Sequence, residues 1–221
     1  MEKKLENKAQ ESKVAVTADS VVLEGNLVIP EGSQGIVLFA HGSGSGRHSP
    51  RNRSVAQVLN QAGFATLLLD LLTVDEETID IRTRHLRFNI DLLAARLMGA
   101  TDWLTHHSET EQLRIGYFGA STGSAAALVA AAARSNVVRA VVSRGGRPDL
   151  AGPVLSQVQA PTLLIVGGHD FAVIEMNQAA LEQLSVEKRL EIVPGATHLF
   201  EEPGALEAVA QLASQWFNLY L

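Results

Sequence analysis

Ser121 is the residue whose neighbours best suit it to act as a nucleophile. It lies at the centre of Gly119-Ala-Ser-Thr-Gly123, between the apolar segment 113–118 and the alanine-rich segment 124–134. The first segment has strand character, and the second has very high helix propensity. A G-x-S-x-G pattern between a strand and a helix is typical of a nucleophile elbow, which presents the serine hydroxyl at the helix N-terminus. Ser124 is an alternative nucleophile, but it lies one turn into the predicted helix.

A serine hydroxyl is a poor nucleophile without a base, and two later residues fit the roles of base and acid. Asp170 follows the apolar strand-like segment 160–168, and His198 follows a short strand and a Pro-Gly turn. The chain order Ser, Asp, His is that of the α/β-hydrolase arrangement and differs from the chymotrypsin and subtilisin orders. We therefore expect His198 to take the Ser121 proton and return it to the leaving group, while Asp170 orients the imidazole.

Other interpretations of the acid stay open at this point. Asp170 could instead be the N-cap of a following helix, because Asp is favoured there. Asp149 and Asp70 are then the alternative acids.

A glycine-rich segment, His41-Gly-Ser-Gly-Ser-Gly46, follows the early strand 34–40. Such a loop can direct backbone N–H groups at a reacting carbonyl, and we assign the oxyanion hole to the amides of Ser43 and Thr122. Loss of one such donor typically costs about 100- to 1,000-fold in rate. A phosphate loop is the competing interpretation, but the spacing is not G-x-x-x-x-G-K-[ST]. His41 is expected to brace the loop, with a substrate-binding role as the alternative.

Two arginines, Arg144 and Arg147, follow the predicted strand 138–143 on a glycine-containing loop. An arginine there could bind a substrate carboxylate with two parallel hydrogen bonds. The alternative is a salt bridge that fixes the loop, for example from Arg147 to Asp149.

These residues need elements to position them, and strands alternate with helices along most of the chain. Alternation of this kind predicts an α/β fold, a mostly parallel sheet with helices on both faces and no cap domain. Residues 1–12 are predicted as a charged tail and 13–221 as a single domain, with segment 71–82 as an acidic loop. The predicted strands are 13–17 and 21–29, an antiparallel pair at one edge, then 36–40, 64–70, 114–118, 138–143, 162–167 and 188–193. The predicted helices are 51–62, 87–107, 122–134, 174–184 and 204–219.

Composition limits the partners. The 221 residues are 46% hydrophobic and 19% charged, with a net charge of −6 and no cysteine. We expect no nucleic-acid partner, because Lys and Arg are not clustered, and no membrane span, because no apolar run approaches the required length. No signal peptide is apparent, so a cytoplasmic location is expected. No metal or other cofactor is predicted, and a homodimer is left open.

The chain resembles the dienelactone-hydrolase-like group of the α/β-hydrolase superfamily. The matching segments span most of the chain from about residue 35 onward. They are His41-Gly-Ser-Gly, Gly119-Ala-Ser-Thr-Gly, Ser143-Arg-Gly-Gly-Arg-Pro-Asp149, Leu164-Ile-Val-Gly-Gly-His-Asp170 and Gly195-Ala-Thr-His-Leu-Phe-Glu201. Dienelactone hydrolases proper use a cysteine nucleophile, and this chain has none. The resemblance therefore implies a serine esterase on that scaffold.

The sequence thus predicts an enzyme, a carboxylic ester hydrolase that acts on a small-molecule ester through an acyl-enzyme on Ser121. Acyl transfer or perhydrolysis on the same triad is an alternative chemistry. A catalytically silent binding module with this fold is the alternative of a different class.

Overall fold

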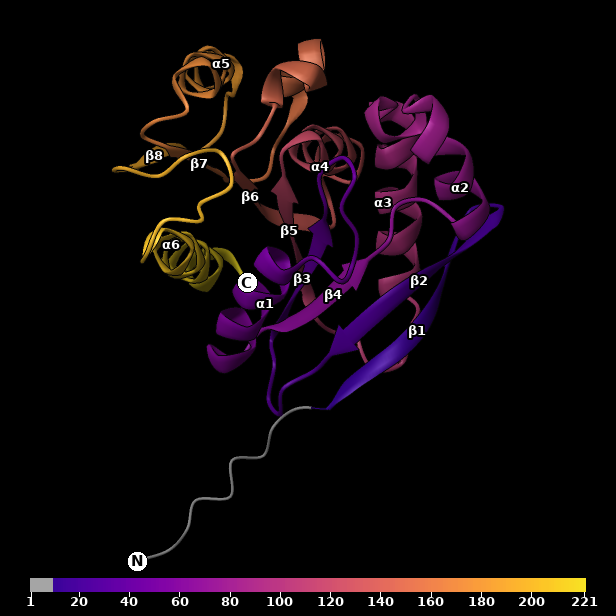
Figure 1. Ribbon diagram of the computed structural model, residues 1–221. Helices are drawn as coiled ribbons and strands as arrows, with labels where there is room; N and C mark the ends of the chain where they lie inside the picture. Colours follow the sequence, from indigo (N-terminus) through magenta and orange to yellow (C-terminus); the bar gives the residue numbers. More distant parts are fainter. Residues whose placement is uncertain (1–9) are drawn as a thin grey trace, which may run out of the picture.

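The computed structural model describes residues 10–221 and has one eight-stranded sheet (Figure 1). The order across the sheet is β1-β2-β4-β3-β5-β6-β7-β8, in which β1, β2 and β4 pair antiparallel and all other neighbours pair parallel. The strands are β1 Glu11–Ala18, β2 Val21–Val28, β3 Gly35–Ala40, β4 Ala65–Leu69, β5 Arg114–Ala120, β6 Val138–Arg144, β7 Thr162–Gly167 and β8 Lys188–Val193. The mostly parallel α/β architecture predicted from the sequence is confirmed.

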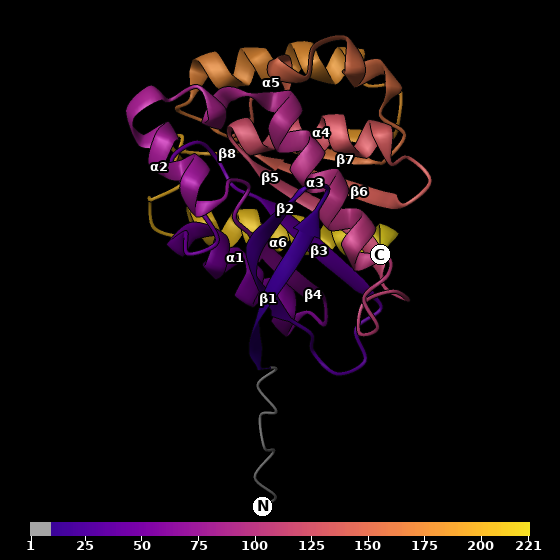
Figure 2. The same ribbon diagram turned by 90° about the vertical axis from the view of Figure 1, so that its right-hand side faces the viewer.

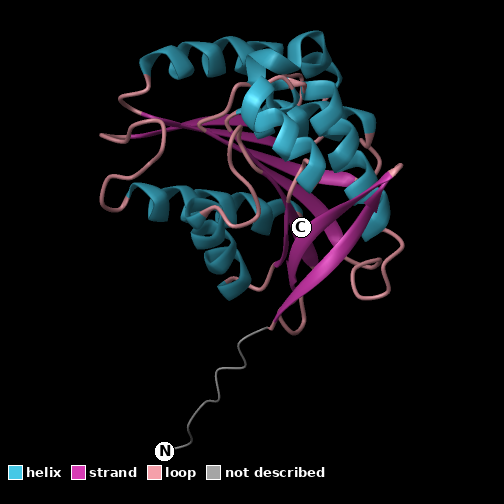
Figure 3. Cartoon of the chain, turned by 45° about the vertical axis from the view of Figure 1, so that its right-hand side comes forward, coloured by secondary structure: helices cyan, strands magenta, loops and turns pink. Residues whose placement is uncertain are grey.

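Helices cover both faces of this sheet, as Figures 2 and 3 show from two further directions. One face carries α3, α4 and α5, and the other carries α1 and α6. The helices are α1 Pro50–Gln61, α2 Val74–Thr83, α3 Ile90–Leu104, α4 Thr122–Ala133, α5 Phe171–Gln183 and α6 Ala205–Tyr220, with short 3-10 helices at Leu86–Phe88 and Pro148–Gln157. Within residues 10–221, no helix has both the length and the apolar character needed to cross a membrane.

The central strands are apolar on both faces because both faces are covered. All residues of β3, β4 and β7 are buried. Such continuous apolar runs are what a doubly covered parallel sheet requires. The sheet therefore separates two hydrophobic cores, one beneath α3, α4 and α5 and one beneath α1 and α6.

The structure differs from the prediction at two segments. Segment 71–82, predicted as an acidic loop, forms α2 from Val74 onward, and a capping box between Thr73 and Glu76 fixes the start of this helix. Such a box satisfies two free backbone donors of a helix N-terminus, and its Thr-x-x-Glu spacing was readable in the sequence. The predicted tail 1–12 overlaps β1, which begins at Glu11; residues 1–9 lie outside the described residues.

Candidate active site

Ser121 occupies the sharp turn between β5 and α4. Its backbone angles are φ 51° and ψ −122°, a conformation that residues other than glycine rarely adopt. Strain of this kind costs on the order of 1–3 kcal/mol and persists only where surrounding contacts impose it. Here the Ser121 N–H donates to the carbonyl of Arg144 at 3.2 Å, and its own carbonyl accepts from the N–H of Arg147 at 3.1 Å. The turn thus has the geometry expected of a nucleophile elbow.

The two glycines that flank this turn allow close contact between the strand and the helix. A Cβ added at Gly119 would lie 2.5 Å from the Cα of Ser124, and one at Gly123 would lie 2.2 Å from the carbonyl oxygen of Ala40. Both contacts are with backbone atoms, which cannot rotate away. The close packing of β3, β5 and α4 therefore requires glycine at both positions.

Replacement of Gly123 by alanine should lower the free energy of unfolding by about 3 kcal/mol or more. At a helix position with free space, the same change would stabilise the protein by roughly 0.5–1 kcal/mol. A decrease in the free energy of unfolding would therefore indicate the clash with Ala40. Urea unfolding of the variant measures the effect. A Gly123→Ala variant as stable as the parent chain would contradict the close approach of β3 and α4.

Asp170 and His198 form a hydrogen-bonded pair at the carboxyl end of the sheet. His198 Nδ1 lies 2.6 Å from Asp170 Oδ2. Asp170 stands at the N-cap position of α5, yet its side chain makes no capping hydrogen bond to that helix. The carboxylate thus contacts the imidazole instead of the helix end. This contact fixes the ring so that Nε2 is the nitrogen left for other partners.

His198 lies beside the turn that carries Ser121. A Cβ added at Gly145 would be 3.6 Å from His198 Cε1, and Gly145 directly follows Arg144, whose carbonyl binds the Ser121 amide. No hydrogen bond joins the Ser121 hydroxyl to His198 among the residues described. Catalytic hydrogen bonds are often long in unliganded enzymes and shorten when substrate binds.

The two alternative acids have other partners. Asp70 forms an ion pair with Arg47 and also accepts the Arg47 backbone N–H at 2.6 Å. Asp149 accepts two hydrogen bonds from Arg147, at 2.9 and 2.8 Å. Neither contacts His198, so Asp170 is the acid that the structure places against the imidazole.

The glycine-rich segment after β3 runs alongside Ser121. A Cβ added at Gly42 would lie 3.1 Å from the Cβ of Ser121. The N–H of Ser43, however, donates to the hydroxyl oxygen of Thr122 at 3.0 Å. This bond fastens the loop to the elbow, and a substrate oxygen would share or replace it. Thr122 is the first residue of α4, where backbone N–H groups have no partner within the helix.

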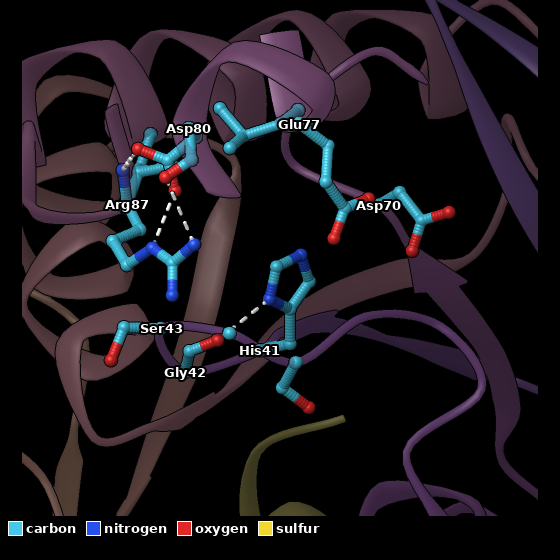
Figure 4. A pocket seen from close by; sticks show the side chains of 11 residues that line it. His41, Gly42, Ser43, Asp70, Glu77, Asp80 and Arg87 are labelled. Carbon is cyan, nitrogen blue, oxygen red and sulfur yellow. Dashed lines mark hydrogen bonds and ion pairs between the residues drawn. The ribbon is translucent and has the colours of Figure 1, made fainter. Parts of the chain in front are cut away.

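His41 is buried beneath this loop, and both of its ring nitrogens are hydrogen-bonded. Figure 4 shows the bond to Gly42. Nε2 accepts the N–H of Leu71 at 3.0 Å, which places the imidazole proton on Nδ1, where it is donated to the carbonyl of Gly42 at 2.9 Å. Burial lowers the pKa of His41, although the carboxylates of Asp70 and Glu77 oppose this effect. The neutral ring therefore braces the loop, as expected, and has no nitrogen left for a substrate.

His41 should make the protein less stable in mild acid. Below pH about 6.5 the unfolded chain binds a proton at this residue that the folded chain binds only at lower pH, so stability falls as the pH drops. The slope from this one group is at most about 1.4 kcal/mol per pH unit. Urea unfolding between pH 5 and 7.5 should give a shallower slope for His41→Gln. The exposed His106→Gln serves as control, and an unchanged slope in His41→Gln would contradict the assignment.

The cavity beside His41 is small. Its free volume of about 20 Å³ is enough for about one water molecule. Asp80 and Arg87 form an ion pair on its wall, and Asp80 is almost fully buried (Figure 4). The sequence did not predict this pair, because Asp80 lies in the segment 71–82, predicted as a loop, and Arg87 lies at the start of the predicted helix 87–107. Across the described chain, no group of three or more His, Cys, Asp or Glu side chains has the arrangement of a metal site.

The two arginines after β6 differ sharply. Arg147 forms a salt bridge with Asp149, the pair that the sequence suggested as an alternative to substrate binding. Arg144 is 8% exposed, and its Nε and Nη1 atoms are shielded from solvent without a hydrogen-bond partner. The sequence could not separate the two residues, because strand alternation and loop geometry decide which one finds a carboxylate.

The sheet order, the elbow and the chain order of Ser121, Asp170 and His198 define the class of the α/β-hydrolase fold. The model of the dienelactone hydrolase family matches residues 23–219, and the chain belongs to that family. Membership of this family supports a hydrolase function.

Solved structures agree with this assignment. The crystal structure of a dienelactone hydrolase from Anabaena variabilis is 69% identical with a TM-score of 0.96, and the match covers 97% of this chain and all of that one. Est1E from Butyrivibrio proteoclasticus, at 16% identity, has a TM-score of 0.78 over 94% of this chain and 98% of its own. The latter similarity shows the fold alone.

The curated relatives have a different name. A putative phosphoribosyl transferase of Mycobacterium tuberculosis, found in strains CDC 1551 and H37Rv, is 59% identical over 208 residues. The match covers 94% of this chain but 46% of the relative. The chain thus spans about half the length of the curated relatives it matches.

Proposed function

We propose that this chain is a serine hydrolase that cleaves carboxylic esters through an acyl-enzyme on Ser121. The observation that carries the proposal is the Asp170–His198 hydrogen bond of 2.6 Å beside a strained serine turn. A carboxylate that holds Nδ1 leaves Nε2 to accept a proton from the serine hydroxyl, which is the division of roles in a catalytic triad.

In the proposed reaction, the Ser121 oxygen attacks the ester carbonyl as its proton passes to His198 Nε2. The tetrahedral oxyanion forms beside the amides of Ser43 and Thr122. Its collapse breaks the bond to the alcohol oxygen, which takes the proton from the imidazolium, and leaves an acyl group on Ser121. Water then attacks the acyl group with His198 as base, which releases the carboxylic acid and restores the serine.

Acyl transfer and perhydrolysis use the same acyl-enzyme and differ only in whether an alcohol or peroxide replaces water. Phosphoribosyl transfer has no comparable support in this chain. The glycine-rich loop after β3 does not have phosphate-loop spacing. The name of the curated relatives describes proteins about twice as long, so we do not extend it to this chain.

Hydrolysis of p-nitrophenyl esters from acetate to octanoate tests the proposal, together with labelling by a fluorophosphonate. We expect turnover of at least the shorter esters and a covalent adduct on the peptide that contains Ser121. An intact chain that neither hydrolyses these esters nor reacts with the probe would favour the binding-module alternative.

A further inference from the structure

Arg144 is a buried cation for which the described residues supply no counter-ion. It is the last residue of β6, and no salt bridge to its guanidinium forms within residues 10–221. Burial of an unpaired charge is costly, so a buried arginine normally has a carboxylate or several hydrogen bonds. Burial and the charge of Arg51 lower the pKa of Arg144 to about 10, which still leaves the group charged at neutral pH. Arg147, three residues along, has the carboxylate partner that Arg144 lacks.

The surroundings of Arg144 add positive charge. Arg51, in the first turn of α1, acts on Arg144 by charge repulsion, and its own Nε is also buried without a partner. Arg51 contacts Glu201 at 3.1 Å, but both side chains are partly exposed, and such surface pairs are weak. An incoming anion can therefore displace this contact without a large energetic cost.

A buried aromatic ring lies against Arg144. The guanidinium carbon is 5.9 Å from the centre of the Phe200 ring, and Phe200 adopts a φ of 56° although it is almost fully buried. A bulky residue rarely adopts this conformation, and such strain gathers at functional sites. The ring flanks the cation but carries no net charge, so the positive charge of Arg144 remains uncompensated.

We propose that Arg144 and Arg51 form a binding site for a small oxyanion, a carboxylate or a phosphate group, between the start of α1 and the loop 198–201. A guanidinium matches the planar or tetrahedral oxygens of such a group with two parallel hydrogen bonds. The site adjoins the candidate active site, because the Arg144 carbonyl binds the Ser121 amide and Gly145 lies against His198. The anion belongs either to a charged substrate or to a separate ligand.

Calorimetric titration with inorganic phosphate and with succinate tests the site directly. We expect both anions to bind the intact chain and Arg144→Met to weaken them about 10- to 100-fold. Arg134→Met, which removes an arginine paired with Asp102 on the surface, is the matched control and should bind as the intact chain does. No binding to the intact chain, or an equal loss in the control, would overturn the proposal.

Thermal unfolding separates an anion site from a structural role. Without added anions, Arg144→Met should raise the unfolding temperature, because methionine removes an uncompensated buried charge. If the Arg144 side chain instead stabilises the loop 198–201, the substitution should lower the unfolding temperature. That result would count against the proposal. Arg51→Met provides a second variant for the titration and should also weaken binding.

Two esters distinguish the sources of the anion. If the anion is part of the substrate, Arg144→Met should raise KM for mono-p-nitrophenyl succinate and spare p-nitrophenyl acetate. If a separate ligand occupies the site, phosphate binding should fall while the ratio of the two KM values stays constant. The titration measures binding without turnover and can be repeated in Ser121→Ala. Its result therefore tests the anion site even if the chain does not hydrolyse esters.

Discussion

Replacement of Ser121 by alanine should reduce kcat for ester hydrolysis by about 10⁵- to 10⁶-fold. The proposed acyl-enzyme cannot form without the hydroxyl, and the residual rate would come from oxyanion stabilisation and binding alone. Steady-state hydrolysis of p-nitrophenyl acetate measures the loss. Fluorophosphonate labelling should disappear in parallel, since the probe reacts with the same oxygen.

Ser124→Ala is the matched control for this prediction. Ser124 lies in the first turn of α4, its hydroxyl is buried and has no hydrogen-bond partner, and it was the alternative nucleophile. Its loss should leave kcat within about threefold and stability nearly unchanged, because no hydrogen bond is broken. Similar losses in both variants, or a larger loss in Ser124→Ala, would contradict the assignment of Ser121.

The sequence predicted most of the fold because strands and helices of a parallel α/β sheet differ in their apolar pattern. The segment of β4 is buried throughout and has no polar alternation, whereas that of α6 has a single apolar face. The sequence did not predict α2, because the apolar residues of this helix are largely exposed. Val74 is 71% exposed and Ile81 65%, so the helix lacks the buried stripe on which periodicity depends.

The order of candidate triad residues was predictable, but their partners were not. The position of Asp170 at a helix start also left an N-cap role open, and only the three-dimensional structure places its carboxylate on His198. The contrast between Arg144 and Arg147 depends on which side chain the end of β6 directs into the core. A sequence cannot state that a buried cation lacks a counter-ion, because this requires the positions of all neighbouring carboxylates.

Replacement of Asp170 by asparagine should lower kcat by about 10⁴-fold and change KM little. Asparagine keeps the shape and the helix-start preference, but its amide favours the wrong imidazole tautomer and cannot stabilise the imidazolium. The variant should therefore unfold at nearly the same urea concentration as the intact chain while ester hydrolysis collapses. Asp149→Asn, which breaks the partly exposed pair with Arg147, should cost less than about tenfold. A larger loss in Asp149→Asn than in Asp170→Asn would transfer the acid role to Asp149, against the hydrogen bond that the structure forms at His198.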